Sequence, residues 1–246
     1  GSDDKLSMEV GEAAFKAKNY QEAVKYLGMI KGADSKQPSY LKMYGEACFL
    51  AKDQAKAYEI FKQLATVTPA DAEVFKKLYE IAEGLGKKDD LLTYLKSYTR
   101  LKPRDVSAQK KLGDILYERK DANGAINAYG AVLAADPSAK GFYNKYAKLV
   151  INSGKDTEIV KVLTGAIKAG EADGQMYAKL GEIYQKQQNY TDAVAMYEKA
   201  IQFNPKDVSL LNRLSECQIK GGKPQAAILT LEQAVAMNPQ ANKEYK

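Results

Sequence analysis

Carboxylates recur along this chain at one fixed interval, a spacing that aligns them in a row if the structure repeats with the same period. The row consists of Glu12, Glu46, Glu80, Asp114, Glu182 and Glu216, and Lys148 interrupts it. Such a row could select a binding partner that carries Lys or Arg. Alternatively, each carboxylate pairs with a lysine of the same chain, and exposed pairs of this kind contribute only about 0–1 kcal/mol each. The sequence leaves both interpretations open.

Residues typical of catalytic sites are sparse. The chain contains no histidine, which removes the commonest general base and the commonest neutral metal ligand. It contains no glycine-rich phosphate loop and no nucleophile elbow. The adjacent Asp89 and Asp90 fall in a predicted turn, where a solvated helix cap is their simplest role. We therefore expect no catalytic activity, no metal site and no cofactor.

The remaining bulk features are those of an ordinary globular protein. Cys48 and Cys217 lie in the apolar stripes of distant predicted helices, so each is expected to be a small buried core residue. The net charge is +6, but the lysines alternate with acidic residues along the helices. We interpret these as solvated faces and expect no nucleic-acid partner. No apolar run reaches about 18 residues, so no membrane span is expected, and the compartment stays undetermined.

The stretch 174–207 shows which elements must position these side chains. Apolar or small residues recur at helical spacing in both halves: Tyr177, Leu180, Gly181 and Tyr184 in the first, Ala193, Tyr197 and Ala200 in the second. The polar run 187–189 between them predicts a turn. Pro205 then ends the second helix, because proline has no backbone N–H to donate.

This pattern resembles the tetratricopeptide repeat, a helix-turn-helix unit of about 34 residues. The register holds without insertion across seven predicted repeats: 4–37, 38–71, 72–105, 106–139, 140–173, 174–207 and 208–241. The resemblance implies an all-α fold, a right-handed solenoid or superhelix whose stacked repeats bury one another's apolar faces. Residues 1–3 are predicted to be a leader with a tag remnant, and 242–246 the start of a further helix or a truncated cap. We expect the chain to be an excised fragment or a mature form.

A few positions within the repeat define its helix packing. Position eight, where the two helices touch, is small in six of seven repeats, and Tyr79 is the exception. Position twenty, on the second helix, is expected to face it. Position thirty-two is proline in five repeats, whereas Ser35 and Glu171 replace it in two, and Pro38 is expected to end the first repeat's second helix. The repeats 72–105 and 140–173 depart most from the pattern, and altered packing is expected there.

The resemblance also assigns an inner, concave face, where ligands of this family usually dock. Positions two, five, six, nine, twelve and thirteen of each repeat are expected to point into this groove, and position nine carries the carboxylate row. Basic residues share the face: Lys42, Lys76 and Lys110 at position five, and Lys77, Lys111, Lys145, Lys179 and Arg213 at position six.

Some family members bind the acidic C-terminus of heat-shock chaperones through a carboxylate clamp. The clamp needs Lys and Asn one turn apart in one first helix, Asn in the next, and Lys and Arg in the third. Here an acidic residue takes the place of the first Asn in six repeats. In the remaining repeat Asn144 and Lys148 occur in the reverse order. We therefore exclude a conventional clamp.

Position twelve places aromatic rings on the same face. Phe15 and Phe49, with Met8 and Leu50, are predicted to form an apolar patch near the N-terminus. Clustered exposed aromatic side chains usually mark a binding surface. Alternatively, the rings pack between adjacent first helices or under a missing N-terminal segment.

We predict from these patterns a non-catalytic protein-protein interaction scaffold that binds a peptide or protein segment in the concave groove. The partner is expected to offer apolar anchors and some basic residues. The predicted contact residues are Met8, Phe15, Glu46, Phe49, Glu80, Asp114 and Tyr117. Two alternatives stay open: a self-assembly module that forms homo-oligomers, and a regulatory or targeting part of a larger multidomain chain. The Lys-rich, Arg-poor composition suggests a bacterial source.

Overall fold

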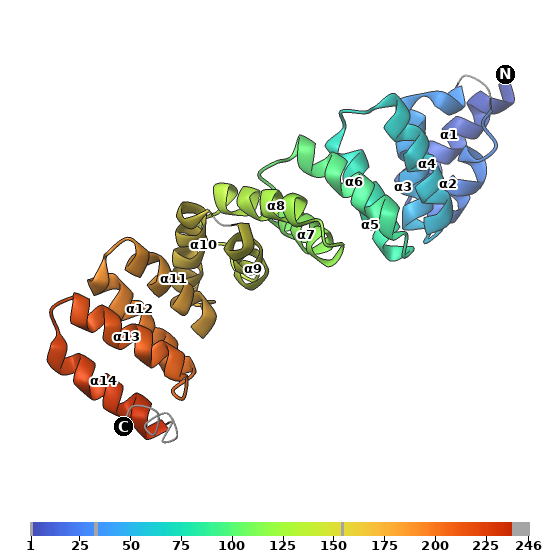
Figure 1. Ribbon diagram of the computed structural model, residues 1–246. Coiled ribbons are helices and arrows are strands. Elements are labelled where there is room, and N and C mark those ends of the chain that lie inside the picture. The colour runs from blue at the N-terminus through green and yellow to red at the C-terminus, as the bar shows by residue number, and fades with distance from the viewer. Residues whose placement is uncertain (1, 32–33, 154, 238–246) are drawn as a thin grey trace. The chain divides into compact units, whose positions relative to one another are not determined.

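The computed structural model describes residues 2–31, 34–153 and 155–237, without the side chains of Ser2 and Ser153 (Figure 1). The regular elements in these ranges are all helical, as the sequence predicts. They are α1 (Ser2–Lys16), α2 (Tyr20–Leu27), the 3-10 helix η1 (Asp34–Lys36), α3 (Pro38–Leu50), α4 (Gln54–Val67), α5 (Ala72–Gly84), α6 (Lys88–Leu101), α7 (Val106–Glu118), α8 (Ala122–Ala135), α9 (Tyr143–Ser153), α10 (Asp156–Ala169), α11 (Gly174–Lys186), α12 (Tyr190–Phe203), α13 (Val208–Lys220) and α14 (Pro224–Met237). The predicted tail 242–246 lies outside the described residues.

The contacts between residues divide the chain into two compact units, Gly1–Ile115 and Leu116–Lys246, and the boundary between them falls within α7. These are called the N-terminal unit and the C-terminal unit below. Across the described helices, no segment is both long enough and apolar enough to cross a membrane.

In the N-terminal unit, consecutive helices pack as antiparallel pairs, α1 with α2, α3 with α4 and α5 with α6. Each pair also contacts the next through α2 with α3 and α4 with α5. The core of this unit is built from apolar side chains that are at most 2% exposed, among them Leu27, Phe61 and Leu78. Burial between neighbouring pairs therefore supplies the apolar core that one pair lacks.

The C-terminal unit is built in the same way. The pairs are α9 with α10, α11 with α12 and α13 with α14, and α12 also packs against α13. One cluster of buried residues joins α12 to α13: Ala193, Val194, Tyr197, Leu214 and Cys217. Helix α11 ends at Lys186 and α12 begins at Tyr190, which confirms the turn predicted at 187–189.

The described turns between the two helices of a pair share one backbone conformation. The residue at position fifteen of the repeat has a positive φ, between 59° and 74°, in Lys18, Lys52, Gly86, Lys120, Gln188 and Gly222. Glycine adopts this conformation without strain, whereas other residues do so at some energetic cost. An Asn or Asp follows in several of these turns, and its side chain caps the next helix, as Asp53 does for the backbone N–H of Lys56 at 3.1 Å.

Close approach of the two helices explains the small residue at position eight. A Cβ atom added to Gly45 would lie 3.1 Å from the ring of Phe61, and one added to Gly181 would lie 2.9 Å from the ring of Tyr197. Phe61 and Tyr197 occupy position twenty-four. The ring at position twenty-four is therefore the nearest side chain to position eight, and the prediction that position twenty faces it stays a prediction.

Two second helices, α2 and α10, lack the proline that ends this helix in other repeats. Pro38 is the first residue of α3, whereas α2 already ends at Leu27, so the prediction that Pro38 ends α2 is wrong. Proline suits the first helical position, because its missing N–H has no partner there. Helix α10 ends instead at Gly170, which has a left-handed φ of 74°. The nearby Glu171 carboxylate accepts hydrogen bonds from the backbone N–H groups of Gly141 and Tyr143, ahead of and in the first turn of α9.

Candidate functional site

The residues predicted to bind a partner all lie on first helices, and all are partly exposed. They are Met8 and Phe15 on α1, Glu46 and Phe49 on α3, Glu80 on α5, and Asp114 and Tyr117 on α7. Tyr117 belongs to the C-terminal unit and the others to the N-terminal unit. A single binding surface that includes all of them stays a prediction.

The carboxylate row divides into paired and unpaired members. Glu182 contacts Lys179 at 3.3 Å and Lys186 at 3.4 Å, and Glu216 contacts Lys220 at 2.6 Å. Glu12 and Lys16 are 4.0 Å apart. By contrast, the described residues include no ion-pair partner within 4.0 Å of Glu46 or Glu80.

These pairings affect the acidity of the carboxyl groups in the C-terminal unit. Burial alone would raise the pKa of Glu182, but hydrogen bonds and charges from Lys179 and Lys186 outweigh it and hold the pKa below its usual value. The hydrogen bond from Lys220 lowers the pKa of Glu216 in the same way. Both groups are therefore ionised at neutral pH and already neutralised by lysines of their own helices.

Lysines also cover aromatic rings of the preceding first helix. The Nζ atom of Lys77 lies 4.4 Å from the ring centroid of Phe49, and Lys145 Nζ lies 5.8 Å from that of Tyr117. In both cases the ring stands at position twelve of one repeat and the lysine at position six of the next. Between the same two positions Lys111 forms an ion pair instead, because its Nζ lies 2.6 Å from Glu83. Cation–π contacts of this kind contribute about 0.5–1 kcal/mol at exposed sites.

Phe15 has a different neighbour. Its ring meets the ring of Tyr20 edge to face, with 5.8 Å between centroids. Position six of the next repeat is Met43, so no basic residue stands there to cover Phe15 as Lys77 covers Phe49. The two rings of the predicted apolar patch therefore have different surroundings.

A cavity of about 350 Å³ lies on the first helices of the C-terminal unit. Its lining is Ile151, Gln175, Ala178, Lys179, Glu182, Tyr197, Ser209, Leu210 and Arg213. Most of these residues come from α11 and α13, and Ile151 comes from α9. Apart from Tyr197 and Leu210, they occupy positions two, five, six, nine and twelve of their repeats.

A second cavity, of about 560 Å³, adjoins the first and shares Gln175, Ala178 and Leu210 with it. Its other lining residues are Lys148, Asp173, Gly174, Ala200, Phe203, Asn204 and Asp207. The two cavities together are called the C-terminal groove below. Phe203 is 57% exposed, and its ring lies 5.9 Å from that of Tyr177. An exposed ring beside a cavity offers a partner an apolar contact without prior rearrangement.

Two carboxylates of the C-terminal groove, those of Asp173 and Asp207, cap the first helices of the repeats that follow them. Asp173 accepts a hydrogen bond from Met176 N at 2.9 Å, and Asp207 accepts from Ser209 N at 3.0 Å, so both cap helices. Two cations of the groove, by contrast, form no ion pair with the described residues. In the parts of the chain that the structure describes, neither Lys148 nor Arg213 has a carboxylate within 4.0 Å.

Arg213 lies close enough to the hydroxyl group of Tyr197 for the two groups to interact. Hydrogen bonding to this hydroxyl raises the pKa of Arg213 above its usual value, so the guanidinium stays charged. Tyr197 in turn donates its own hydrogen bond to Gln185 Oε1 at 2.8 Å. The buried tyrosine is therefore a neighbour of both Gln185 and the exposed cation Arg213.

The sequence pattern placed several of these lining positions on the inner face but did not single them out. Phe203 and Leu210 lie outside the inner-face positions. The exposed ring of Phe203 could have been noticed as an aromatic residue near the end of a helix, whereas Leu210 occupies a position that is buried in earlier repeats, such as Val74 and Met176, and carries no such signal. In the sequence, Lys148 appears as an interruption of the carboxylate row and as part of the reversed Asn144 and Lys148 pair. Its importance depends on which neighbouring carboxylates are already paired, and spacing alone does not contain this information.

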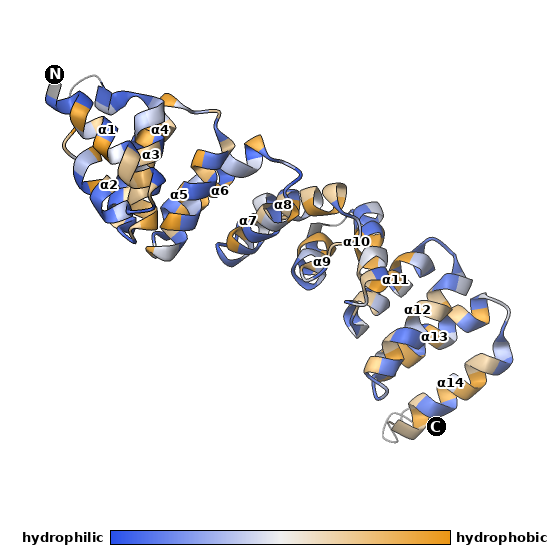
Figure 2. Ribbon diagram, turned by 180° about the vertical axis from the view of Figure 1, so that it is seen from behind, coloured by the Kyte–Doolittle hydropathy of each residue, from blue (hydrophilic) through white to orange (hydrophobic). Residues whose placement is uncertain are grey.

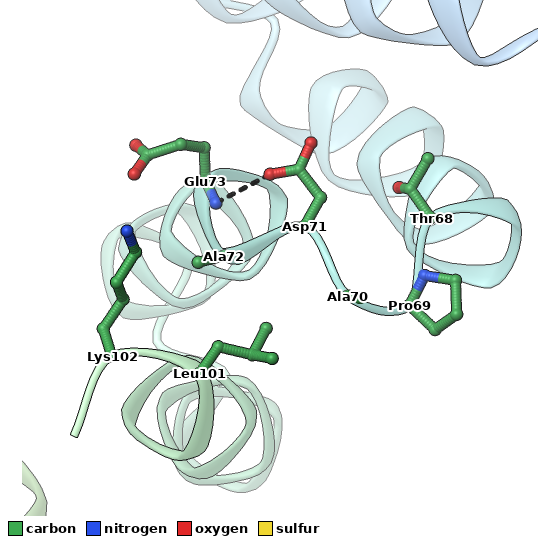
Figure 3. Close-up of a pocket in the computed structure, with 8 residues that line it drawn as sticks. All are labelled: Thr68, Pro69, Ala70, Asp71, Ala72, Glu73, Leu101 and Lys102. Atoms are coloured by element: carbon green, nitrogen blue, oxygen red, sulfur yellow. Dashed lines mark hydrogen bonds between the residues drawn. The ribbon is translucent and has the colours of Figure 1, made fainter.

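The N-terminal unit has a cavity at the corresponding place in the repeat, with a volume of about 620 Å³ (Figure 3). It is lined by Thr68, Pro69, Ala70, Asp71, Ala72, Glu73, Leu101 and Lys102. Figure 3 shows the loop 68–71 on one side and the end of α6 on the other, with Asp71 accepting a hydrogen bond from Glu73 N at 2.9 Å. Here Glu73 and Lys102 stand where the C-terminal groove has Gln175 and Asn204.

The two cysteines lie away from these cavities, and both are buried. Burial raises the pKa of the Cys48 thiol to about 12 and also raises the pKa of Cys217. Both thiols are therefore protonated at neutral pH, in agreement with the core role predicted for them. Among the described residues, no group of three or more acidic, Cys or His side chains is arranged to hold a metal ion.

Comparison with known proteins identifies the repeat. Two family profiles described as tetratricopeptide repeat match residues 80–140 and 184–246, which together make up half of the chain. The DnaJ homolog subfamily C member 7 homolog of Dictyostelium discoideum is 23% identical over 207 residues, which cover 82% of this chain and 34% of that protein. The TPR repeat-containing protein MJ1428 of Methanocaldococcus jannaschii is 24% identical over 317 residues, which cover 90% of this chain and 56% of that protein.

The chain thus spans about a third to just over half of the length of these curated relatives. Among solved structures, MamA AMB-1 has a TM-score of 0.50 and 18% identity, over 69% of this chain and 92% of that chain. This likeness concerns the fold. Together with the paired helices and the residues that recur with the period of the repeat, the family matches show that the chain belongs to the tetratricopeptide repeat family.

Proposed function

We propose that this chain is a non-catalytic interaction scaffold that binds an extended segment of a partner protein in the C-terminal groove. Tetratricopeptide repeat proteins are generally protein-interaction scaffolds. The observation that carries the proposal is the pair of adjoining cavities, about 350 and 560 Å³, that share Gln175, Ala178 and Leu210. A preformed concave surface of this kind needs little ordering when a partner binds.

The groove favours a particular chemistry in its partner. Lys148 and Arg213 are available to carboxylates, whereas Glu182 is already neutralised by two lysines. Leu210 and the exposed ring of Phe203 offer apolar contact. The partner segment therefore carries acidic residues together with at least one apolar or aromatic anchor. This differs from the basic partner predicted from the carboxylate row.

The N-terminal unit supports a second candidate. Glu46 and Glu80 occupy the same position on α3 and α5, and neither has an ion-pair partner within 4.0 Å among the described residues. Phe49, covered by Lys77, lies one turn after Glu46. A segment with basic residues suits this face, as the sequence predicts. Reversing the charge of Glu46, Glu80 and Asp114 together is expected to weaken such a partner, and unchanged affinity would remove this candidate.

The main proposal is tested by selecting random peptides displayed on phage against the immobilised full chain. We expect the selected peptides to be rich in Asp and Glu and to carry an aromatic residue. Their affinities are then measured by fluorescence titration for the wild type and for the double variant Lys148→Glu, Arg213→Glu. Reversal of two exposed charges should weaken binding at least about tenfold.

A control variant separates a local effect from the overall change in charge. Lys199→Glu alters an exposed residue of α12 that lines neither cavity, and it should leave the affinity unchanged. Selection of basic peptides that bind the double variant as tightly as the wild type would reject the C-terminal groove and favour the second candidate.

A further inference from the structure

A further cavity of the C-terminal unit adjoins the C-terminal groove and has a volume of about 220 Å³. It is called the basic cavity below, and it is lined by Tyr117, Lys120, Ala122, Lys148, Leu149 and Asn152. Lys148 also lines the larger cavity of the groove, so the two hollows meet at this side chain. None of the residues that line the basic cavity is acidic, whereas each of the three cavities described above includes at least one carboxylate.

Helix α9 supplies two polar side chains to one wall of the basic cavity. Lys148 and Asn152 lie one turn apart on the exposed side of this helix. The buried residues of the same stretch are Tyr146, Ala147 and Val150. Figure 2 shows this division as hydrophilic and hydrophobic residues along α9. Packing of the apolar side therefore holds the amide of Asn152 and the stem of Lys148 beside the cavity.

The turn between α7 and α8 supplies the opposite wall. The backbone N–H of Lys120 donates to the carbonyl oxygen of Tyr117 at 3.1 Å, and Lys120 has a φ of 63°. Lys145 adds positive charge beside the cavity, since its Nζ lies 5.8 Å from the centroid of the Tyr117 ring. The carboxylate next to Lys120 in the sequence, that of Asp121, already caps α8 by accepting a hydrogen bond from Gly124 N at 2.9 Å. Positive charge therefore predominates around the basic cavity.

The two lysines of the basic cavity are an exception in the repeat pattern. Lys120 stands at position fifteen of its repeat, and Lys148 stands at position nine of the next one. In every other pair of successive repeats, the residue at position nine is acidic. Neither lysine has an ion-pair partner within 4.0 Å among the described residues. Two cations that line one cavity repel each other, and a bound anion would offset this repulsion.

We propose that the basic cavity binds a phosphate group carried by the partner segment, as on a phosphorylated serine or threonine. This inference rests on the proposed binding of an extended segment in the C-terminal groove, which the basic cavity lengthens at Lys148. A phosphate monoester has a charge of about −1.5 to −2 at neutral pH and three acceptor oxygens, which suit two ammonium groups, an amide and a phenol hydroxyl. A carboxylate offers a single charge and two oxygens, so it fits this set of donors less well.

Phosphorylated forms of the selected acidic peptides test the proposal. Each peptide is resynthesised with a short extension at either end, in which phosphoserine, serine or glutamate is placed at each position in turn. Affinities for the full chain are measured by fluorescence titration. At the position that reaches the basic cavity, phosphoserine should raise the affinity at least about tenfold over serine, and glutamate should raise it less.

The variant Lys120→Gln separates the basic cavity from the groove, because Lys120 lines only the former. The turn should persist, since Gln188 occupies the same repeat position with a φ of 59°. The variant should lose most of the gain from phosphoserine and bind the serine peptide as the wild type does. The matched control is Lys52→Gln, which changes the same repeat position in the N-terminal unit and should keep the full gain.

A second measurement does not depend on the selected peptides. The amino acid O-phospho-L-serine is titrated into the full chain, and the backbone amide signals are followed by NMR. We expect shifts at Tyr117, Lys120, Lys148 and Asn152 that are smaller in Lys120→Gln but not in Lys52→Gln. If the selected peptides prove to bind outside the groove, these shifts would still support the basic cavity as a phosphate site, so the two proposals can fail separately.

Three results would overturn the inference. The first is the absence of shifts at these amides. The second is an equal gain from phosphoserine in Lys120→Gln and in the wild type. The third is the presence of the shifts without a gain at any position of peptides that do bind in the groove, which would indicate a site for a free phosphate compound instead.

Discussion

The two units apply one repeat pattern to surfaces of different charge. On the N-terminal unit, Glu46 and Glu80 stand without ion-pair partners within 4.0 Å among the described residues. On the C-terminal unit, Glu182 and Glu216 are paired with lysines of their own helices, whereas Lys148 and Arg213 have no described carboxylate at that distance. The repeat therefore fixes where a side chain points, and the local pairing fixes which charges a partner meets.

The cavities differ in the same way. In the N-terminal unit, the cavity beside α5 is bordered by Glu73 and Lys102. The corresponding cavity in the C-terminal unit has Gln175 and Asn204 there, and it continues into a second cavity along α11 and α13. The cavity of the C-terminal unit therefore lacks the two charges of Glu73 and Lys102, contains the exposed ring of Phe203, and forms part of a longer groove.

The largest effects are expected from removing the large core side chain at position twenty-four. Phe61→Ala and Tyr197→Ala should each cost about 3–5 kcal/mol of unfolding free energy, because both rings are almost fully buried. Since contacts are made mainly between neighbouring repeats, each loss should stay largely within its own unit. Hydrogen exchange read by mass spectrometry should show faster exchange in α3–α5 for the first variant and in α11–α13 for the second. Equal acceleration throughout both units would contradict their separation.

A smaller effect is expected from filling the space beside these rings. Gly45→Ala and Gly181→Ala each add a Cβ within 3.1 Å of a ring and should cost about 1–3 kcal/mol, measured by chemical denaturation. Only Gly181→Ala displaces Tyr197, which lines the C-terminal groove, so only this variant should also weaken binding of the selected acidic peptides. Unchanged binding by Gly181→Ala would show that the groove does not depend on the position of Tyr197.

Removing a single buried hydroxyl group should affect stability differently in the two units. The hydroxyl of Tyr58, in the N-terminal unit, is buried near Asp90 and Tyr94 but makes no well-formed hydrogen bond among the described residues. By contrast, the Tyr197 hydroxyl donates to Gln185 Oε1 at 2.8 Å. Tyr197→Phe should therefore cost about 1 kcal/mol, and Tyr58→Phe should leave stability unchanged or raise it by up to about 1 kcal/mol. Thermal denaturation of both variants checks this difference. Destabilisation by Tyr58→Phe would indicate that its hydroxyl has a partner.

The smallest effect concerns pH and the two carboxylate–lysine pairs of the C-terminal unit. The folded state lowers the pKa values of Glu182 and Glu216 from their ordinary value of 4.5. A lowered pKa adds stability that is fully present above the unfolded value and is lost as pH falls through the folded value. The contribution should therefore begin to fall below about pH 4.5 and disappear once the pH is below the lowered, folded-state pKa values. It should be small, because both pairs are partly exposed to solvent. Thermal midpoints of wild type and Glu182→Gln should converge as the pH is lowered, and a constant difference would contradict the pairing.

Much of the fold follows from sequence spacing, because helices and turns depend on local residues. The repeat period predicts helices ending and beginning around the turn 187–189, as found for α11 and α12. The left-handed conformation of Lys52 and Lys120 was not predictable, since lysine has no preference for it and the packing of the two helices imposes it.

The candidate site was less predictable than the fold, because it depends on contacts between helices. Spacing placed Phe49 and Lys77 on one face, but the contact between them joins two successive repeats and needs the offset between neighbouring helices. Likewise, Arg213 was placed on the inner face, whereas its link to Tyr197 depends on how closely α12 approaches α13. Side-chain pairing between helices therefore decides the binding chemistry, and one-dimensional spacing does not specify it.

The most direct test of the proposed function compares the two units in one experiment. Amide hydrogen exchange of the full chain is followed by mass spectrometry, with and without a saturating acidic peptide obtained by the phage selection. Binding in the C-terminal groove predicts added protection in α11 and α13, within 174–186 and 208–220, and none in α3 or α5. Protection confined to α3 and α5 would contradict the account and place the binding site on the N-terminal unit.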